Sequence, residues 1–216
     1  MRVFVVMLCL FCVSLLNAQV TDNFSDGDFT GNPVWTLSSA SDFSVGASQL
    51  KSANTTTNSN FYISTTNTLT SNCTWEFWVN LQFSTSGSNY VDAYLISDNS
   101  NLLASNINGY FVRIGNTFDD ILLYKSTAGA QAILIDGVNV SVASASNNLI
   151  KIKVTRTSAN LFTLERDMTG TGSSYFSEGT ITDATFSTST TFGFAIKQST
   201  ASFFGKHLLM ILTLLR

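Results

Sequence analysis

Apolar and polar side chains alternate along residues 75–83, with Trp78 as the exception, and this is the clearest pattern in the chain. One set of positions is Trp75, Phe77, Val79, Leu81 and Phe83, and the other is Glu76, Trp78, Asn80 and Gln82. A period of two is typical of a β-strand with one buried and one solvated face. The segment therefore predicts a strand whose first set enters a core, while Trp78 stands among polar side chains.

Shorter runs rich in β-branched and aromatic residues recur along the chain, and Gly, Asn, Ser and Asp separate them. These runs are residues 61–64, 90–97, 110–115, 121–125, 132–136, 149–155, 161–166 and 191–196. No segment between residues 19 and 206 has a helical period. Many short strands punctuated by turns predict an all-β protein, built as a two-sheet antiparallel β-sandwich.

Residues 1–18 have the features of a secretion signal peptide. Arg2 provides a positive charge, residues 3–16 are apolar except for Ser14, and Ala18 supplies a small residue at the end. This order predicts cleavage after Ala18. We therefore expect a secreted protein, extracellular or at the cell surface, with no membrane span after cleavage.

The last ten residues break the alternation. Residues 207–216 are almost wholly apolar, but a helix that crosses a bilayer needs about 20 residues. A strand of this composition would place apolar side chains on both faces, so it would be buried or would promote aggregation. We therefore expect a β-sandwich domain at residues 19–206 and an aberrant hydrophobic tail at residues 207–216.

Composition narrows the classes of partner. Charged residues make up 12% of the 216, and the formal net charge is −3. An acidic chain without clustered Lys and Arg is a poor candidate for binding nucleic acid. Cys73 is the one cysteine outside the signal segment, so no disulfide can form within the mature chain.

Several segments resemble one family of secreted modules. They are residues 22–29 (Asp-Asn-Phe-Ser-Asp-Gly-Asp-Phe), 33–35 (Pro-Val-Trp), 93–98 (Ala-Tyr-Leu-Ile-Ser-Asp), 109–115 (Gly-Tyr-Phe-Val-Arg-Ile-Gly), 152–156 (Ile-Lys-Val-Thr-Arg) and 192–194 (Phe-Gly-Phe). Together they are similar to the N-terminal β-sandwich module of secreted and surface proteins of gliding, polymer-degrading bacteria. The resemblance implies a concanavalin-A-like or laminin-G-like jelly roll, followed in a parent protein by downstream domains.

The end of the chain departs from that family. The last strand of such modules usually reads Phe-Asp-Asp-Ile, whereas residues 209–213 read Leu-Met-Ile-Leu-Thr. Codons for Phe-Asp-Asp-Ile-Asp that lose one base encode this second sequence. We therefore expect that a frameshift replaced the last strand and truncated the chain, although a genuine hydrophobic tail is the alternative.

Three aspartates near the mature N-terminus are candidate ligands for a structural calcium ion. Jelly-roll modules of this shape often hold Ca²⁺ between an N-terminal Asp and a C-terminal Asp-rich strand, and Ca²⁺ takes six to eight oxygen ligands. Asp22, Asp26 and Asp28 would supply part of such a site. The alternative is that they form turns by accepting hydrogen bonds from their own backbone.

A sugar-binding surface is predicted on the polar face of residues 75–83. Sugars stack on exposed aromatic rings, and amides and carboxylates fix their hydroxyl groups. Trp78 flanked by Glu76, Asn80 and Gln82 fits that description. By the same argument Phe111 and Arg113 form a second candidate. A loop or a neighbouring domain that covers Trp78 is the alternative.

Signatures of catalysis are mostly absent from the sequence. His207 is the sole histidine and lies in the tail, so a catalytic triad or a histidine-based zinc site is not expected. The leading hypothesis is a non-catalytic module for adhesion or domain spacing in a larger extracellular or cell-surface protein. The alternatives are a carbohydrate-binding module that recognises polysaccharide or cell-surface glycan through an aromatic face, and the remnant of a secreted hydrolase.

Overall fold

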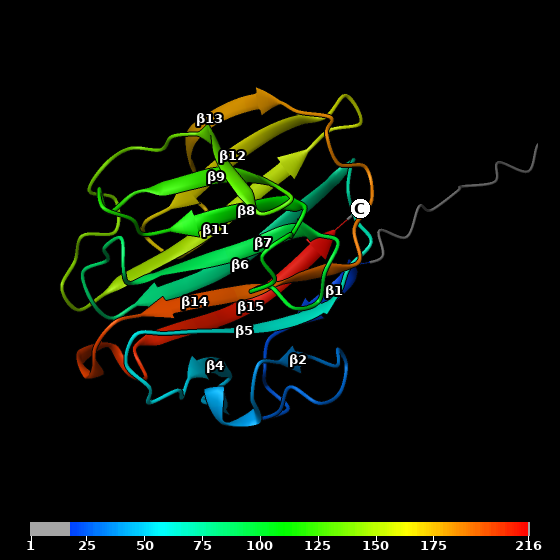
Figure 1. Ribbon diagram of the computed structural model, residues 1–216. Helices are drawn as coiled ribbons and strands as arrows, with labels where there is room; N and C mark the ends of the chain where they lie inside the picture. Colours follow the sequence, from blue (N-terminus) through cyan, green and yellow to red (C-terminus); the bar gives the residue numbers. More distant parts are fainter. Residues whose placement is uncertain (1–17, 216) are drawn as a thin grey trace, which may run out of the picture.

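Two antiparallel β-sheets, A and B, stack face to face in the computed structural model, which describes residues 18–215 (Figure 1). Sheet A has the order β13-β12-β11-β6-β15-β4-β3, with β1 also paired to β15, and sheet B has the order β10-β9-β8-β7-β14-β5-β2. This architecture confirms the predicted two-sheet antiparallel β-sandwich of the jelly-roll type. Most of the predicted signal peptide, residues 1–17, lies outside the described residues.

Strands β5 to β12 and β14 correspond to the runs seen in the sequence, whereas β1 to β4, β13 and β15 have no counterpart among those runs. Sheet A contains β1 (Ala18–Asp22), β3 (Phe43–Gly46), β4 (Gln49–Ser52), β6 (Cys73–Leu81), β11 (Asn148–Arg156), β12 (Leu161–Asp167), β13 (Phe176–Thr182) and β15 (His207–Leu215). Sheet B contains β2 (Thr36–Leu37), β5 (Ser59–Thr66), β7 (Tyr90–Ser97), β8 (Gly109–Ile114), β9 (Ile121–Thr127), β10 (Ala130–Ile135) and β14 (Thr191–Gln198). Two short 3-10 turns, η1 (Ala40–Asp42) and η2 (Ala201–Phe203), precede β3 and β15. No helix among the described residues is long and apolar enough to cross a membrane.

The core lies between the inner faces of the two sheets. Trp75, Phe77 and Val79 of β6 are fully buried there, whereas Glu76 and Trp78 on the other face keep partial exposure. Phe77 packs edge-on against Phe194 of β14 in sheet B, with ring centroids 5.5 Å apart. The alternation along residues 75–83 therefore has the physical cause expected from the sequence.

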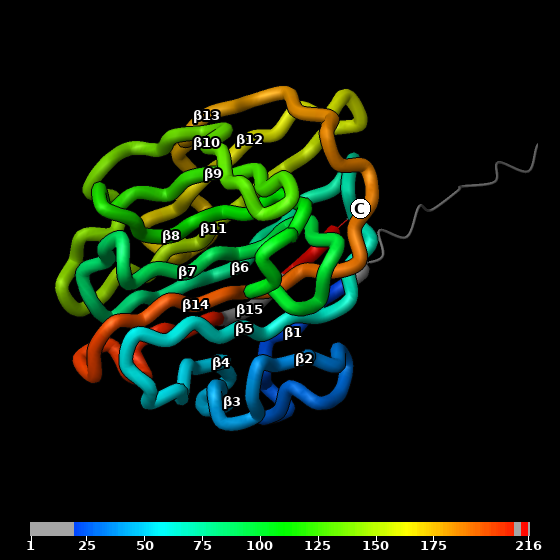
Figure 2. Tube along the Cα trace, viewed as in Figure 1, coloured from blue at the N-terminus to red at the C-terminus, as the bar shows by residue number. Residues whose placement is uncertain are grey.

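The apolar segment after residue 206 forms β15, an interior strand of sheet A. It pairs with β6 on one side, and with β4 and then β1 on the other. Figure 2 shows the blue β1 beside the red β15. Leu209 and Leu214 are buried in the core. The sheet thus continues across the position at which the sequence predicts the end of the domain, while the frameshift stays a prediction.

His207, the first residue of β15, is fully buried and makes stability depend on pH. Its Nδ1 lies 3.2 Å from Ser52 Oγ, Nε2 has no hydrogen-bond partner, and its ring packs against Phe83. Burial lowers the pKa of His207 to about 3, against about 6.5 in an unfolded chain. The unfolded state therefore binds a proton below pH 6.5 that the folded state does not.

Stability from this group is complete above pH 6.5 and declines as the pH falls toward 3. Between pH 7 and pH 5 we expect a loss of about 2 kcal/mol from the free energy of unfolding. Urea denaturation at the two pH values measures it. His207→Asn should show a correspondingly smaller loss, because the carboxylates titrate alike in both proteins. Equal losses in the two proteins would contradict the assignment.

A candidate binding pocket on the outer face of sheet B

Three aromatic side chains line up across β7, β8 and β9 on the face of sheet B that points away from the core. Phe111 of β8 lies between Tyr94 of β7 and Tyr124 of β9, with ring centroids 4.9 Å and 5.0 Å apart. Their chain neighbours, such as Val112 and Leu123, enter the main core instead. The period of two therefore builds a second, smaller apolar cluster outside the sandwich.

A loop, residues 98–108, covers this aromatic row. Leu102 and Ile107 of the loop are buried against it. The loop is held to the β9–β10 hairpin, where Gly129 N donates to Ile107 O at 3.0 Å and Ser126 Oγ donates to the same oxygen at 2.9 Å. Gly129 has φ +84°, and a Cβ there would lie 1.9 Å from Ser105 O. The close approach of loop and hairpin therefore requires glycine at this position.

A buried ion pair adjoins the aromatic row. Asp92 of β7 and Arg113 of β8 are cross-strand neighbours, and Arg113 donates from Nε to Asp92 Oδ1 at 2.7 Å and from Nη2 to Asp92 Oδ2 at 2.8 Å. The guanidinium carbon lies 4.1 Å from the ring centroid of Tyr90 and 4.9 Å from that of Tyr124. The pair is thus fixed in position by two parallel hydrogen bonds and by ring contacts.

The protonation states follow from burial and pairing. Burial raises the pKa of Asp92, and the hydrogen bonds and charge of Arg113 oppose that rise. Burial lowers the pKa of Arg113, but the hydrogen bond and charge of Asp92 outweigh it, so that pKa is raised. Burial, followed by the charge of Asp92, also raises the pKa of Tyr94, so its hydroxyl stays protonated and can donate a hydrogen bond at neutral pH.

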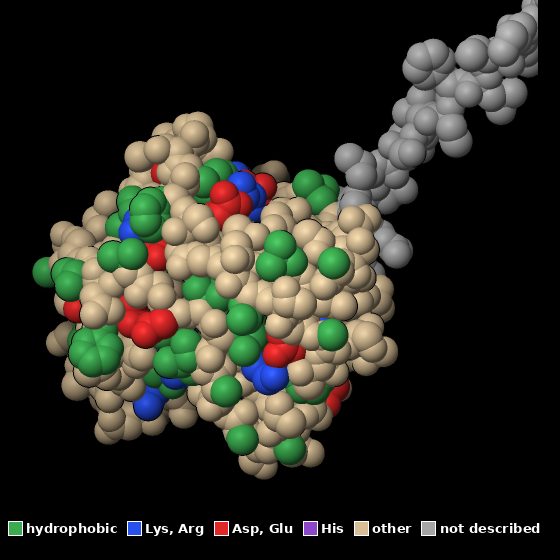
Figure 3. Space-filling model, turned by 90° about the horizontal axis from the view of Figure 1, so that it is seen from above, with side chains coloured by type: hydrophobic (Ala, Val, Ile, Leu, Met, Phe, Trp, Pro, Cys, Tyr) green, Lys and Arg blue, Asp and Glu red, His purple; other side chains and the backbone are tan. Residues whose placement is uncertain are grey.

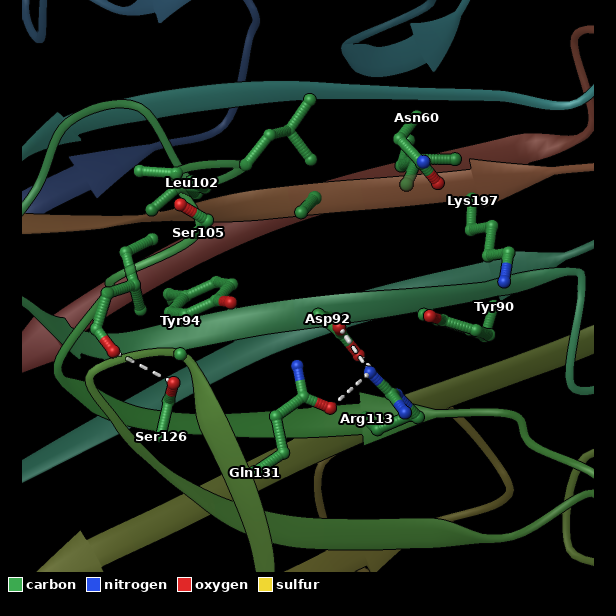
Figure 4. Close-up of a pocket in the computed structure, with 16 residues that line it drawn as sticks. Asn60, Tyr90, Asp92, Tyr94, Leu102, Ser105, Arg113, Ser126, Gln131 and Lys197 are labelled. Atoms are coloured by element: carbon green, nitrogen blue, oxygen red, sulfur yellow. Dashed lines mark hydrogen bonds and ion pairs between the residues drawn. The ribbon is translucent and has the colours of Figure 1, made fainter.

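These groups line a pocket of about 300 Å³ between the loop and the sheet. Figure 4 shows Lys197 of β14 directed toward Tyr90 on one side, Leu102 and Ser105 of the loop on another, and Gln131 of β10 beside Arg113. Arg113 Nη2 lies 3.3 Å from Gln131 Oε1. The volume is at the lower end of the range for small-molecule sites, and amide, hydroxyl and charged groups converge in it.

The four residues predicted to bind sugar lie on sheet A or just beyond it, away from this pocket. Trp78 Nε1 donates to Gly170 O at 2.6 Å, and Lys151 Nζ lies 3.8 Å from the Trp78 ring centroid. Glu76 pairs with Lys151 and accepts from Tyr175. Asn80 is buried and donates to Asn147, while Gln82 follows the end of β6 and is half-buried. Trp78 Nε1, the Glu76 carboxylate and the Asn80 amide nitrogen are thus engaged within the protein, whereas Asn80 Oδ1 is buried without a partner.

The three aspartates predicted to bind calcium act as hydrogen-bond acceptors in turns. Both oxygens of Asp22 are used, Oδ1 by Phe24 N and Oδ2 by Trp35 Nε1, each at 2.7 Å. Asp28 Oδ1 accepts from Thr30 N at 2.7 Å, and Asp26 Oδ1 accepts from Asp28 N. Within residues 18–215, no group of three or more His, Cys, Asp or Glu is arranged to hold a metal ion. The three side chains thus serve the turn geometry, and the calcium ion stays a prediction.

Of the second sugar-binding candidate in the sequence, Arg113 lines the sheet B pocket, and Phe111 is buried in the aromatic row beside it. Asp92, Tyr94 and Lys197 were not singled out. The available signal was the alternation in residues 90–97 and 191–196, which places Asp92 and Tyr94 opposite the core positions and, continued by one residue, does the same for Lys197. Which strands lie side by side depends on the topology, and the pattern alone does not give it.

Comparison with known proteins places the fold. No protein-family model and no curated protein sequence matches the chain. Among solved structures, the Ca²⁺/Man-bound exoplasmic/lumenal domain of VIP36 matches with a TM-score of 0.68 at 11% identity, covering 92% of this chain and 90% of that one.

Two further solved structures agree with it. The Emp47p carbohydrate recognition domain matches with a TM-score of 0.66 at 11% identity, covering 93% of this chain and 96% of that one. Carbohydrate-binding module CBM66 from Bacillus subtilis matches with a TM-score of 0.59 at 15% identity, covering 84% of this chain and 95% of that one. The chain therefore has the concanavalin-A-like jelly-roll fold that these three domains share.

Proposed function

We propose that this domain is a carbohydrate-binding module whose site is the pocket on the outer face of sheet B. The observation that carries the proposal is the convergence in that pocket of a fixed carboxylate–guanidinium pair, an amide and tyrosine hydroxyls. Structures of the same fold include carbohydrate recognition domains and a carbohydrate-binding module. These observations favour carbohydrate binding over the adhesion or domain-spacing role that was the leading hypothesis from the sequence.

Hydrogen bonding to sugar hydroxyl groups suits these side chains. Each Asp92 oxygen accepts one bond from Arg113 and keeps a lone pair for a sugar hydroxyl. The Gln131 carbonyl faces Arg113, and its amide group is exposed at the pocket. The buried aromatic rings hold these groups in place, so recognition here relies on hydrogen bonds rather than on an open stacking platform.

The same fold in neighbouring structures suggests a setting for the binding. The VIP36 domain is described as exoplasmic/lumenal. Together with the predicted signal peptide, this supports a glycan ligand met outside the cytoplasm, on a polymer or a cell surface. Adhesion of a larger protein to that surface would be a direct consequence of such binding.

The test is affinity electrophoresis against a panel of soluble polysaccharides, followed by calorimetric titration with oligosaccharides. The double variant Asn60→Ala/Gln131→Ala removes two exposed amides that line the pocket. We expect retardation by at least one glycan and about a tenfold loss of affinity in the variant. Stability should stay within about 0.5 kcal/mol of the unchanged protein, because both positions are exposed.

Two variants on sheet A serve as controls. Thr180→Ala changes an exposed side chain of β13, and Trp78→Leu removes the aromatic ring that the sequence singled out. Both should retain binding. Loss of binding in Trp78→Leu with none in the pocket variant would move the site to sheet A, and no retardation by any glycan would refute the function.

A further inference from the structure

The charge in the sheet B pocket has a sign opposite to that of the whole chain. The charged residues that line it are Asp92, Arg113 and Lys197. Asp92 and Arg113 neutralise each other through their two hydrogen bonds, which leaves the charge of Lys197. The formal net charge of the chain is −3, so a positive pocket is a local feature and does not follow from composition.

Lys197 is the group that makes this charge available. Its strand neighbours are Asn60 on β5 and Tyr90 on β7, both at the pocket. Lys197 forms no ion pair among residues 18–215, and its ammonium group donates to Gly87 O at 3.5 Å. An ammonium group has three donors, so donors remain for a ligand. Most lysines of sheets A and B, by contrast, are paired: Lys125, Lys151 and Lys153 each have a carboxylate partner.

A second cation beside the same ring strengthens the argument. Lys197 Nζ lies 5.5 Å from the Tyr90 ring centroid and Arg113 Cζ lies 4.1 Å from it. Lys197 and Arg113 carry like charges near one ring, so they repel each other. Asp92 compensates the charge of Arg113, and no carboxylate in the pocket forms an ion pair with Lys197. Burial, followed by the charge of Asp92, raises the pKa of Tyr90, so its hydroxyl remains a donor. A ligand anion at this place would meet an ammonium group and a hydroxyl donor together.

We propose that the pocket prefers glycans that carry an anionic group, a uronate carboxylate or a sulfate ester, and that Lys197 binds that group. This inference rests on the proposed function, since it names the class of sugar for the same site. Hydrogen bonds to an ionised acceptor are shorter and stronger than neutral ones. A neutral sugar brings no anion to pair with the Lys197 ammonium group. It therefore binds less tightly than an anionic sugar.

The experiment compares binding of polygalacturonate, carrageenan, a neutral glucan and a mannan to four proteins. Lys197→Gln removes the charge and Lys197→Arg keeps it. Lys51→Gln is the matched control, because it makes the same change in net charge at an exposed position of β4. We expect about a tenfold loss of affinity for an anionic glycan in Lys197→Gln alone, and weaker binding at higher ionic strength.

Each result decides between outcomes. Preference for polygalacturonate identifies a carboxylate ligand, and preference for carrageenan identifies a sulfate. Equal losses in Lys197→Gln and Lys51→Gln would mean attraction by overall charge and would overturn the inference. Tighter binding of a neutral glycan than of either anionic polysaccharide would overturn it as well, but would leave the proposed function standing. No binding of any glycan would refute both.

Discussion

Replacing Arg113 by methionine is expected to lower the free energy of unfolding by about 3–5 kcal/mol and to abolish glycan binding. Removing one partner of a buried ion pair leaves an uncompensated charge, and Asp92 is only 6% exposed. The substitution also removes the cation that contacts the rings of Tyr90 and Tyr124. Urea denaturation and calorimetric titration measure the two effects.

A double variant separates stability from recognition. Asp92→Leu/Arg113→Met removes both charges, so no unpaired carboxylate remains in the protein. We expect it to recover most of the lost stability and to stay unable to bind. If the double variant binds glycan like the unchanged protein, the ion pair has no part in recognition. If Arg113→Met alone loses less than about 1 kcal/mol, the pair is not as isolated from solvent as its exposure indicates.

Replacing Arg156 by methionine is expected to cost about 3–5 kcal/mol of stability without any direct effect on the pocket. Arg156 ends β11, is 1% exposed, and has no carboxylate in an ion pair within the described part of the chain. Its Nη1 donates to Thr70 O at 2.6 Å and Phe186 O at 2.9 Å, and its Nη2 donates to Asp183 O at 3.0 Å. Three part-buried hydrogen bonds from a charged donor to backbone carbonyls would be lost.

The planar donor group is what these carbonyls require. Arg156→Lys keeps the charge but offers a single nitrogen, which cannot replace two that point in different directions. We therefore expect Arg156→Lys to be destabilised by more than half as much as Arg156→Met. Urea denaturation curves for the two variants test this, and near-wild-type stability in Arg156→Lys would show that charge alone is sufficient. At urea concentrations below the midpoint of unfolding, where each variant is still folded, its affinity for glycan should not change.

The sandwich was predictable from sequence because its cause is local. Alternation along residues 75–83 follows from one face of β6 being buried, and turn residues mark the ends of the other strands. The segment after residue 206 lacks that alternation, and the reason is topological. Its strand lies in the interior of sheet A, where Leu209 enters the core and Leu208 on the opposite face is still half-buried.

The site was predictable only in part because it depends on contacts between distant segments. Trp78 reads as an exposed ring from its strand, yet Gly170, 92 residues further on, accepts its hydrogen bond. The aromatic row of β7, β8 and β9 is closed by residues 98–108 and the β9–β10 hairpin. Strand periodicity gives the face on which Phe111 and Arg113 lie, but it does not give the loop that turns this face into a pocket.

The placement of β14 and β15 has a consequence for the order in which the molecule can form. In sheet B, β14 joins the block β10-β9-β8-β7 to β5-β2, and in sheet A, β15 joins β13-β12-β11-β6 to β4-β3 and β1 (Figure 3 shows the completed surface from above). These are the last two strands along the chain, so sheet B stays in two parts until β14 is synthesised and sheet A stays in three parts until β15 is synthesised. Such non-local pairing gives a high contact order and slow folding. Five strands, β1, β4, β5, β6 and β7, therefore each lack a partner strand until the end of synthesis, which makes early chaperone binding or export in an unfolded state an advantage for this topology.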